Sequence, residues 1–364
     1  MSEEYAEKVR KTIGLAVRYG FTEVFTTIHL PEYSLDQQLD AFEMIAGYAK
    51  EKGLEVTVDI GGPFFDRILN SEKDLNRMKE IPFDFVRLDY GYDAKQIQRL
   101  YEELDLSGFV LNASMFDKEE ILRQVKILKQ IDPKMEIRTC HNFYPRKDTG
   151  LDEVFAIRQD SYFRDLGIPV YYCVPTHSNP RGPLYEGLCT LEKHRYAPLR
   201  EILCDLYLDH HIEALMMSDE WLSEEEFMEV DRTLSLLSEP LNETIEIGVL
   251  LAGTITGKEK EIVLQEHAFR YDSGLAILRS RSSRQMAEFA SAIEKNDAVE
   301  REAGAITIDN SLYKRYSGEL QVVLKKQDAD ERVNVIGKVK DSDDLIRLAR
   351  FREGIRYVFV EAEE

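Results

Sequence analysis

The sequence predicts an α/β fold, a TIM-type (β/α)8 barrel that lacks its first strand, followed by a smaller, mostly β domain. Three observations lead to this prediction. Apolar, β-branched runs alternate with helical patterns through the first part of the 364-residue chain. No GxGxxG motif follows an early strand, which argues against an open dinucleotide-binding sheet. Beyond residue 239 the sequence pattern changes, and short strand-like segments are separated by glycines and charged turns. The predicted domains are therefore 1–239 and 240–364.

Seven segments of the first domain have the continuous apolar, β-branched character of strands that are covered on both faces. They are Glu23–Leu30, Leu54–Ile60, Phe83–Asp89, Gly108–Ser114, Met135–Asn142, Pro169–Pro175 and Ile212–Asp219. A barrel of this class has eight strands. The missing strand should precede the first predicted helix, Ser2–Tyr19, with which the chain starts.

Helix signals separate these strands. Ser34 and Gln37 have the spacing of a capping box, and Ser223 and Glu226 repeat it before another apolar-periodic run. Lys118–Ile131 is a further predicted helix.

The second domain is predicted to be a small β barrel or sandwich, because its strands are short and its turns are charged or contain glycine. Its predicted strands include Glu261–Tyr271, Ala305–Asp309, Glu319–Lys326 and Val333–Val339.

Composition excludes several classes of function. The net charge of −21, from 47 basic and 68 acidic residues, disfavours binding to nucleic acid or to anionic membranes. No apolar run approaches the roughly 20 residues of a membrane span, and the N-terminus lacks a signal-peptide pattern, so we expect a cytoplasmic protein. The four cysteines show no CxxC spacing, so we expect no metal site and no disulfide framework. No cofactor is expected, and the oligomeric state is left open.

Polar residues occur at nearly every predicted strand end. Because the carboxyl ends of barrel strands carry the active site, we expect these residues to converge on one rim. The set is His29, Asp59, Asp89, Asn112, His141, Asn142 and Asp219. Each residue alone is equally compatible with a structural role, such as capping by Asp59 or Asp219, or pairing of Asp89 with Arg87.

Two loop segments concentrate further polar chemistry. The segment RTCHNFYPRKDTGL, residues 138–151, adds Tyr144 and Arg146 to the end of a buried strand. The segment HSNPRGPLYEGLCTLEKHR, residues 177–195, carries Arg181, Glu186 and Glu192 among prolines and glycines that give the loop a fixed shape.

Four motifs now suggest a family. The stretches LNAS, CHNFYPRKDTGL, GPLYEGLCTLEKHR and AITIDNSLYKRYSGELQVV resemble the bacterial 6-phospho-N-acetylmuramidases, glycoside hydrolase family 170. The resemblance implies a TIM barrel with a C-terminal cyclophilin-like domain. It also implies cytoplasmic cleavage of N-acetylmuramic acid 6-phosphate from N-acetylglucosamine in cell-wall recycling. The chain departs from the family pattern in lacking the first strand and in having Cys189 where the family has proline.

Glycoside hydrolysis normally uses two carboxyl groups, although an N-acetyl sugar also permits attack by its own amide oxygen. We predict Glu186, beside Tyr185 and Leu188, as the acid and Asp89 as the second carboxylate. Asp219 and Asp59 are the reserve candidates.

The anionic substrate requires cations in this acidic chain. Arg181 is the predicted phosphate ligand, because an arginine binds phosphate with two parallel hydrogen bonds. The second domain offers Arg279, with Arg281 and Arg284, and a charged surface strand is the alternative interpretation of that cluster. The remaining predicted substrate contacts are Asp59, Asn112, His141, Asn142, Tyr144, Arg146 and Glu192.

Two other functions stay open. A different sugar-phosphate lyase or an aldolase would use the same rim, but an aldolase needs a Schiff-base lysine, which none of these strand ends carries. A non-catalytic sugar-phosphate-binding protein on a degenerate barrel would bind the substrate without turnover.

Overall fold

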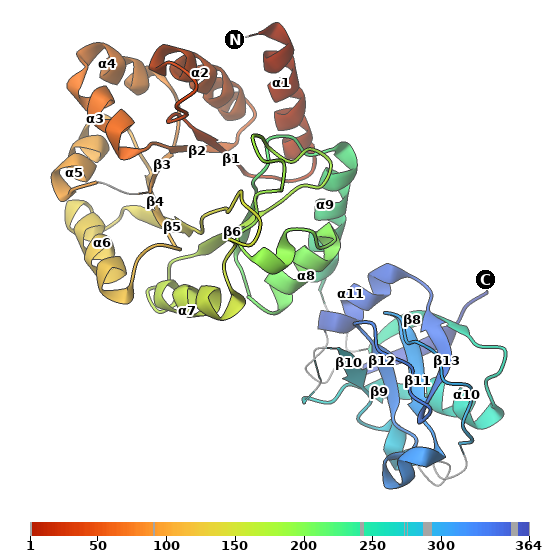
Figure 1. The fold of residues 1–364 in the computed structure, drawn as a ribbon. Helices are drawn as coiled ribbons and strands as arrows, with labels where there is room; N and C mark the ends of the chain where they lie inside the picture. The colour runs from red at the N-terminus through yellow and green to blue at the C-terminus, as the bar shows by residue number, and fades with distance from the viewer. Residues whose placement is uncertain are drawn as a thin grey trace. The chain divides into compact units, whose positions relative to one another are not determined.

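The computed structural model describes residues 2–89, 92–240, 244–272, 274, 276–286, 293–350 and 356–363. The chain forms two compact units, Met1–Asp231 and Arg232–Glu364 (Figure 1). Among the described residues, no helix has the length and apolar character needed to cross a bilayer.

The first unit is built on a curled sheet of seven parallel strands that follow one another in chain order. The strands are β1 Glu23–Thr27, β2 Glu55–Asp59, β3 Phe85–Leu88, β4 Gly108–Asn112, β5 Glu136–Cys140, β6 Val170–Val174 and β7 Ala214–Met217. Each lies inside one of the seven predicted segments, so these predictions are confirmed. Because all strands run in the same direction, their carboxyl ends meet along one edge.

Helices follow the strands and surround the sheet (Figure 1). They are α1 Glu3–Arg18, α2 Leu35–Glu51, α3 Gly62–Asn70, α4 Glu72–Glu80, α5 Ala94–Glu103, α6 Lys118–Ile131, α7 Glu153–Arg164, α8 Leu199–Leu208 and α9 Glu224–Ser238, the last crossing the unit boundary. Both predicted capping boxes form. The Gln37 amide donates to Ser34 Oγ at 3.3 Å, and the Ser223 amide donates to Glu226 Oε2 at 2.9 Å.

The sheet is an incomplete barrel. β1 and β7 are its edge strands, and no pairing between them occurs in the described part of the chain. The element before β1 in the chain is the helix α1. The α/β class and the curled parallel sheet are therefore confirmed, whereas a closed ring of eight strands is not present in the described residues.

An apolar layer inside the curl supports the rim. Phe85, Val110, Cys140 and Cys173 come from four adjacent strands and pack together, almost completely buried. Side chains two residues apart on a strand face the same side. Of the four positions two residues further along, three are polar, namely Arg87, Asn112 and Asn142, and the fourth is Pro175.

The second unit contains a mixed sheet of seven strands in the order β10-β12-β11-β13-β8-β14-β9. Its neighbouring strands are antiparallel except for β8 and β14. Its strands are β8 Thr244–Leu251, β9 Glu266–Ala268, β10 Ile277–Arg279, β11 Ala305–Asp309, β12 Leu320–Val323, β13 Val333–Val339 and β14 Arg356–Glu361. Two helices accompany them, α10 Gly257–Val263 and α11 Ser342–Arg350.

One strand prediction in this unit is wrong at its start. Residues 261–263 belong to α10, and only Glu266–Ala268 of the predicted segment Glu261–Tyr271 is a strand. The cause is a capping box at Thr256 and Glu259, which begins a helix just before the apolar residues.

Candidate active site

Two carboxylates on neighbouring strands share one arginine. Asp59 ends β2, and Asp89 follows β3, the strand that carries Arg87. Nη1 of Arg87 lies 3.1 Å from Oδ1 of Asp89 and 3.5 Å from Oδ1 of Asp59. Arg87 is only 5% exposed. An arginine buried this deeply needs acidic partners to compensate for its lost hydration, so these three side chains form one electrostatic unit.

The two carboxyl groups differ in their environment. Burial raises the pKa of Asp59 and the charge of Asp89 adds to this effect, against the opposing charges of Arg87 and His29. Nε2 of His29 lies 3.9 Å from Asp59 Oδ2. The Asp89 side chain is more exposed than that of Asp59, at 21% against 12%. A carboxyl that retains its proton beside a more exposed carboxylate is the arrangement that acid–base catalysis uses.

Two asparagines complete the centre of the rim. Nδ2 of Asn112 donates to Asp89 Oδ1 at 2.6 Å and to Asn142 Oδ1 at 3.1 Å. Nη2 of Arg87 donates to the same Asn142 oxygen at 2.6 Å. The orientation of the Asn112 amide is fixed because its Oδ1 accepts from the Ser114 amide at 2.8 Å. Four predicted site residues, with Arg87, are thus brought together.

His141 lies beneath this rim. It is 1% exposed, and both ring nitrogens are engaged. Nδ1 contacts Ser114 Oγ at 2.9 Å, and Nε2 contacts Asp160 Oδ1 at 2.8 Å. The ring therefore has no free nitrogen for the substrate contact that the sequence predicted, and its role is argued from these partners below.

Tyr144 extends the rim from the loop after β5. Burial raises the pKa of Tyr144, whereas hydrogen bonds with Ser114 and Asn142 lower it, so the hydroxyl lies beside both residues. The Tyr144 amide donates to the Cys189 carbonyl at 2.9 Å, which ties this loop to the one after β6.

Asp219 organises the loop after β6. Its carboxylate accepts from the amides of Thr176 at 2.9 Å, Arg181 at 2.7 Å and Leu188 at 3.3 Å. With Asp219 only 4% exposed, both of its oxygens serve the loop backbone. The same loop holds the Arg181 guanidinium 4.9 Å from the centre of the Phe143 ring.

Glu186 and Glu192 contact the main chain of the neighbouring loop. Glu186 Oε2 accepts from the Lys147 amide at 2.7 Å. Glu192 accepts from the amides of Asp148 at 2.9 Å and Gly150 at 2.8 Å. A two-point hydrogen bond with Arg195 lowers the pKa of Glu192 to about 2. Both carboxylate oxygens of Glu192 are therefore used in hydrogen bonds that hold the loops together.

The two other predicted arginines have different surroundings. Arg146 is exposed in the loop after β5. Arg279 belongs to the second unit, where Nε and Nη2 donate to Glu319 at 2.5 and 2.8 Å. The substrate contacts of Arg146 and Arg279 stay predictions.

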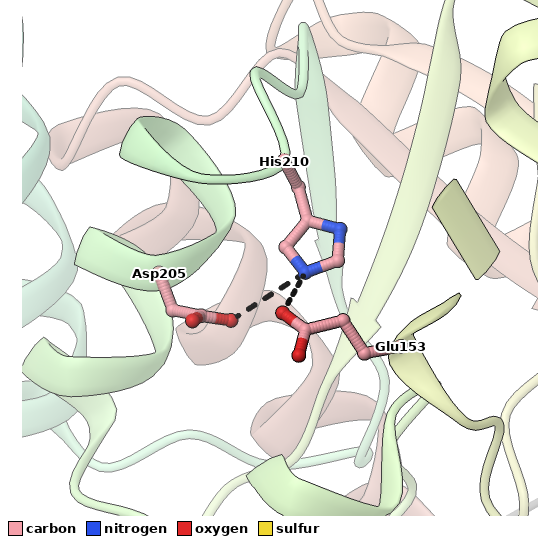
Figure 2. A group of neighbouring side chains, drawn as sticks. All are labelled: Glu153, Asp205 and His210. Carbon is pink, nitrogen blue, oxygen red and sulfur yellow. Dashed lines mark hydrogen bonds and ion pairs between the residues drawn. The ribbon is translucent and has the colours of Figure 1, made fainter. Parts of the chain in front are cut away.

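A group of three potential metal ligands lies outside the rim (Figure 2). One atom each of Glu153, Asp205 and His210 falls within 4.8 Å of the others. Lys193 Nζ lies 2.8 Å from Asp205 Oδ2 and also pairs with Glu153. Burial raises the pKa of Asp205, but hydrogen bonds from His194 and Lys193 outweigh it and lower the pKa to about 2. The carboxylates thus already have a cation between them, and we assign the group to an ion-pair network.

A cavity of about 220 Å³ lies between the sheet and helices α5 and α6. Leu88, Asp89 and Leu111 are among the residues that line it, and the two leucines alternate along their strands with the rim residues Arg87 and Asn112. The cavity is therefore on the helix side of the sheet. It is smaller than the roughly 300 Å³ of typical ligand pockets, so we place no substrate there.

The sequence analysis missed three residues that organise the site. Ser114 was part of a predicted strand but had no assigned role, and Asp160 and Tyr172 were not singled out. A signal for Asp160 was present, because it lies between Ala156 and Phe163 on the buried face of α7.

Comparison with known proteins gives a consistent result for both units. Residues 1–232 match the model of the 6-phospho-N-acetylmuramidase N-terminal domain, and residues 245–359 match that of the C-terminal domain. A solved structure of an uncharacterized B. cereus protein is 27% identical, with a TM-score of 0.63, and the match covers 98% of this chain and 96% of that one. A conserved Enterococcus faecalis protein of unknown function is 26% identical, with a TM-score of 0.62, covering 98% and 92% of the two chains. A comparison with curated proteins found no match.

Proposed function

The chain belongs to the 6-phospho-N-acetylmuramidase family, whose members are glycoside hydrolases, and we propose that Asp59, Arg87 and Asp89 carry the family reaction in it. That reaction is hydrolysis of the bond between N-acetylmuramic acid 6-phosphate and N-acetylglucosamine, in cell-wall recycling. The proposal is supported above all by the shared contact of both carboxyl groups with Arg87 Nη1.

Asp59 is proposed as the general acid. Its raised pKa, caused first by burial, favours the protonated form that the leaving oxygen needs. Asp89 is proposed as the base or nucleophile, because it is the more exposed of the two carboxyl groups and because Arg87 and Asn112 fix its position through Oδ1. Breaking the glycosidic bond then requires one proton from Asp59 for the leaving oxygen. Asp89 either takes a proton from the water molecule that attacks the anomeric carbon, or attacks that carbon itself to form an intermediate that water then hydrolyses.

This assignment differs from the sequence prediction, which gave the acid role to Glu186. Glu186 lies in a loop, where Oε2 accepts a hydrogen bond from the Lys147 amide at 2.7 Å, a contact that commits this oxygen to the neighbouring loop. We propose Glu186 as a loop or substrate contact and Asp219 as the residue that shapes the loop after β6.

The substrate phosphate is proposed to bind Arg181 and Arg146. Among the described residues, neither guanidinium forms an ion pair, in contrast to most arginines of the chain, so both have donors available. Arg181 is also held in place, by its main-chain bond to Asp219 and by Phe143.

We further infer that the curled sheet is a TIM-type barrel without its first strand and that the second domain is cyclophilin-like. The motif resemblance supports this inference, together with the seven parallel strands and the mixed sheet of the second unit.

The proposal is tested with the full chain and the disaccharide N-acetylmuramic acid 6-phosphate–N-acetylglucosamine. Release of N-acetylglucosamine is expected from the parent chain, with a much slower release from the dephosphorylated disaccharide. Asp89→Asn should abolish turnover while preserving the fold. Binding without turnover in the parent chain would contradict the proposal and favour a non-catalytic sugar-phosphate-binding protein.

A further inference from the structure

A line of buried hydrogen bonds runs from the interior of the first unit to the rim. It starts at Asp160 on α7, passes through His141 and reaches Ser114, which follows β4. The three residues are 0%, 1% and 7% exposed, respectively. All three residues are buried, so their hydrogen-bonding groups must be satisfied largely within the protein.

The direction of each bond follows from the number of available protons. A carboxylate only accepts, so Asp160 receives the Nε2 proton of His141 on one oxygen and the Tyr172 hydroxyl on the other, at 2.8 and 2.7 Å. In the neutral ring, Nδ1 of His141 is then an acceptor. The single hydroxyl proton of Ser114 goes to this nitrogen, which leaves Ser114 Oγ to accept from the Asn142 amide at 2.9 Å.

Asp160 has a second hydrogen-bonding partner, Tyr172 of β6. The Tyr172 oxygen also lies 3.3 Å from Nδ1 of His210. Nε2 of His210 reaches Glu153 Oε1 at 3.2 Å, within the network that Figure 2 shows. The carboxylate of Asp160 is thus fixed through both of its oxygens.

Ser114 connects this line to the catalytic centre through two bonds. Its amide fixes Oδ1 of Asn112, which turns Nδ2 toward Asp89. Its hydroxyl holds the backbone of Asn142, whose side-chain oxygen accepts from Arg87. Both groups that contact Asp89, the Asn112 amide and the Arg87 guanidinium, therefore depend on where Ser114 lies.

We propose that Asp160, His141 and Ser114 are positioning residues that hold Asp89 and its two donors in one arrangement. The functional meaning of this role rests on the proposed function of Asp89 in hydrolysis. His141 thereby acts through Ser114 rather than on the substrate.

The first test measures positioning without turnover. The carboxyl carbon-13 resonance of Asp89, identified by its loss in Asp89→Asn, is compared between the parent full chain and the variants Ser114→Ala and Asp160→Asn. The resonance is expected to shift or broaden in both variants. Asp160→Asn keeps the shape of the side chain, so this variant alone can test the proposal if Ser114→Ala does not fold.

The second unit supplies a matched control. Ser280 Oγ contacts His267 Nδ1 at 3.0 Å and accepts from the Ser283 amide at 3.1 Å, and both Ser280 and His267 are 1% exposed. Ser280→Ala removes the same kind of buried serine–histidine contact in the unit that does not contain Asp89. The Asp89 resonance should not move in this variant. An Asp89 resonance that is unchanged in folded Ser114→Ala or Asp160→Asn overturns the proposal.

The second test uses kinetics. A displaced catalytic group slows the chemical step, and a displacement near 1 Å can cost about a hundredfold. We expect kcat to fall about 10- to 100-fold in Ser114→Ala and Asp160→Asn, with KM within about twofold of the parent. An unchanged kcat in a folded variant contradicts the positioning role but leaves the proposed function of Asp89 in place. A parent chain without turnover contradicts the proposed function instead, and the Asp89 resonance then decides positioning by itself.

Discussion

Arg195 and Glu192 form a two-point ion pair, with Nε 2.8 Å from Oε1 and Nη2 2.7 Å from Oε2. Arg195 is 1% exposed, and its remaining donors reach the carbonyls of Tyr144 and Gly187 at 2.9 and 3.0 Å. One guanidinium thus joins the loop after β5 to the loop after β6. This ion pair therefore helps to fix the shape of the rim, since both of the loops that it joins carry proposed substrate contacts.

Arg195→Met should therefore destabilise the first unit strongly. The change removes the ion-pair partner of the partly exposed Glu192 and takes a donor from buried carbonyls, and each buried polar group left unpaired costs about 1–3 kcal/mol. Chemical denaturation of the full chain, followed by circular dichroism, measures the free energy of unfolding. Arg77→Met is the control, because Arg77 pairs with Asp40 and Glu43 at the exposed surface, and a loss below about 1 kcal/mol is expected there. Equal losses in the two variants would contradict the structural role of Arg195.

The roles of Asp59 and Asp89 can be separated with a substrate that has a good leaving group. Asp59→Asn should lower kcat/KM for the natural disaccharide by about 10²–10⁴, because the leaving oxygen loses its proton donor. An aryl glycoside of N-acetylmuramic acid 6-phosphate needs little protonation, so Asp59→Asn should retain most activity on it. Asp89→Asn should lose activity on both substrates. The reverse pattern would exchange the two roles, and full activity of both variants would exclude the pair.

Arg181→Gln tests the proposed phosphate contact. KM for the phosphorylated disaccharide should rise about 10- to 100-fold, as expected for the loss of one charged hydrogen-bonding partner. KM for the dephosphorylated disaccharide should stay within about twofold, since the main-chain bond of residue 181 to Asp219 is retained. Arg158→Gln, an exposed position on α7, provides the matched loss of one positive charge. A similar rise in KM for both substrates would contradict a contact with phosphate.

The sequence was sufficient for the strands of the first unit, because a strand buried on both faces has a continuous apolar pattern that a helix does not share at such short length. It was also sufficient for the helix starts at Ser34 and Ser223, where local capping chemistry decides the structure. At Glu261 a helix replaced the predicted strand, because the capping signal at Thr256 was overlooked.

The candidate site was predictable only in part. Strand ends indicated Asp59, Asp89, Asn112 and Asn142, because parallel strands bring their ends to one edge. Which carboxylate is buried and which is bonded to main-chain amides depends on loop conformation. Asp219 and Glu192 had the same appearance in the sequence as Asp59, but the structure commits their oxygens to loop amides. Asp160 lies on a helix, away from every strand end, so its contact with His141 required the tertiary structure.

The pH dependence of stability in the second unit provides a further prediction. Burial, followed by the charge of Glu319, raises the pKa of Asp309 to about 7. The folded chain then keeps a proton that the unfolded chain loses near pH 4, so the unfolding free energy should fall as the pH rises from about 4 to 7. Asp309→Asn removes this slope and should make the unit more stable than the parent above pH 7, by up to about 4 kcal/mol.

Asp330→Asn is the control of opposite sign for this prediction. Hydrogen bonding with Arg332 lowers the pKa of Asp330 to about 2, so its stabilising effect is present above pH 4 and is lost as the pH falls toward 2. The Asp330→Asn chain should therefore be slightly less stable than the parent above pH 4. It should keep most of the parent slope between pH 4 and 7, because burial and Glu319 raise the pKa of Asp309 more than the charge of Asp330 does. Denaturant unfolding of the full chain, measured from pH 4 to 8, compares the three curves. If Asp309→Asn also keeps the parent slope, the proton that is taken up on folding does not reside on Asp309, and the buried carboxyl is ionised at neutral pH after all.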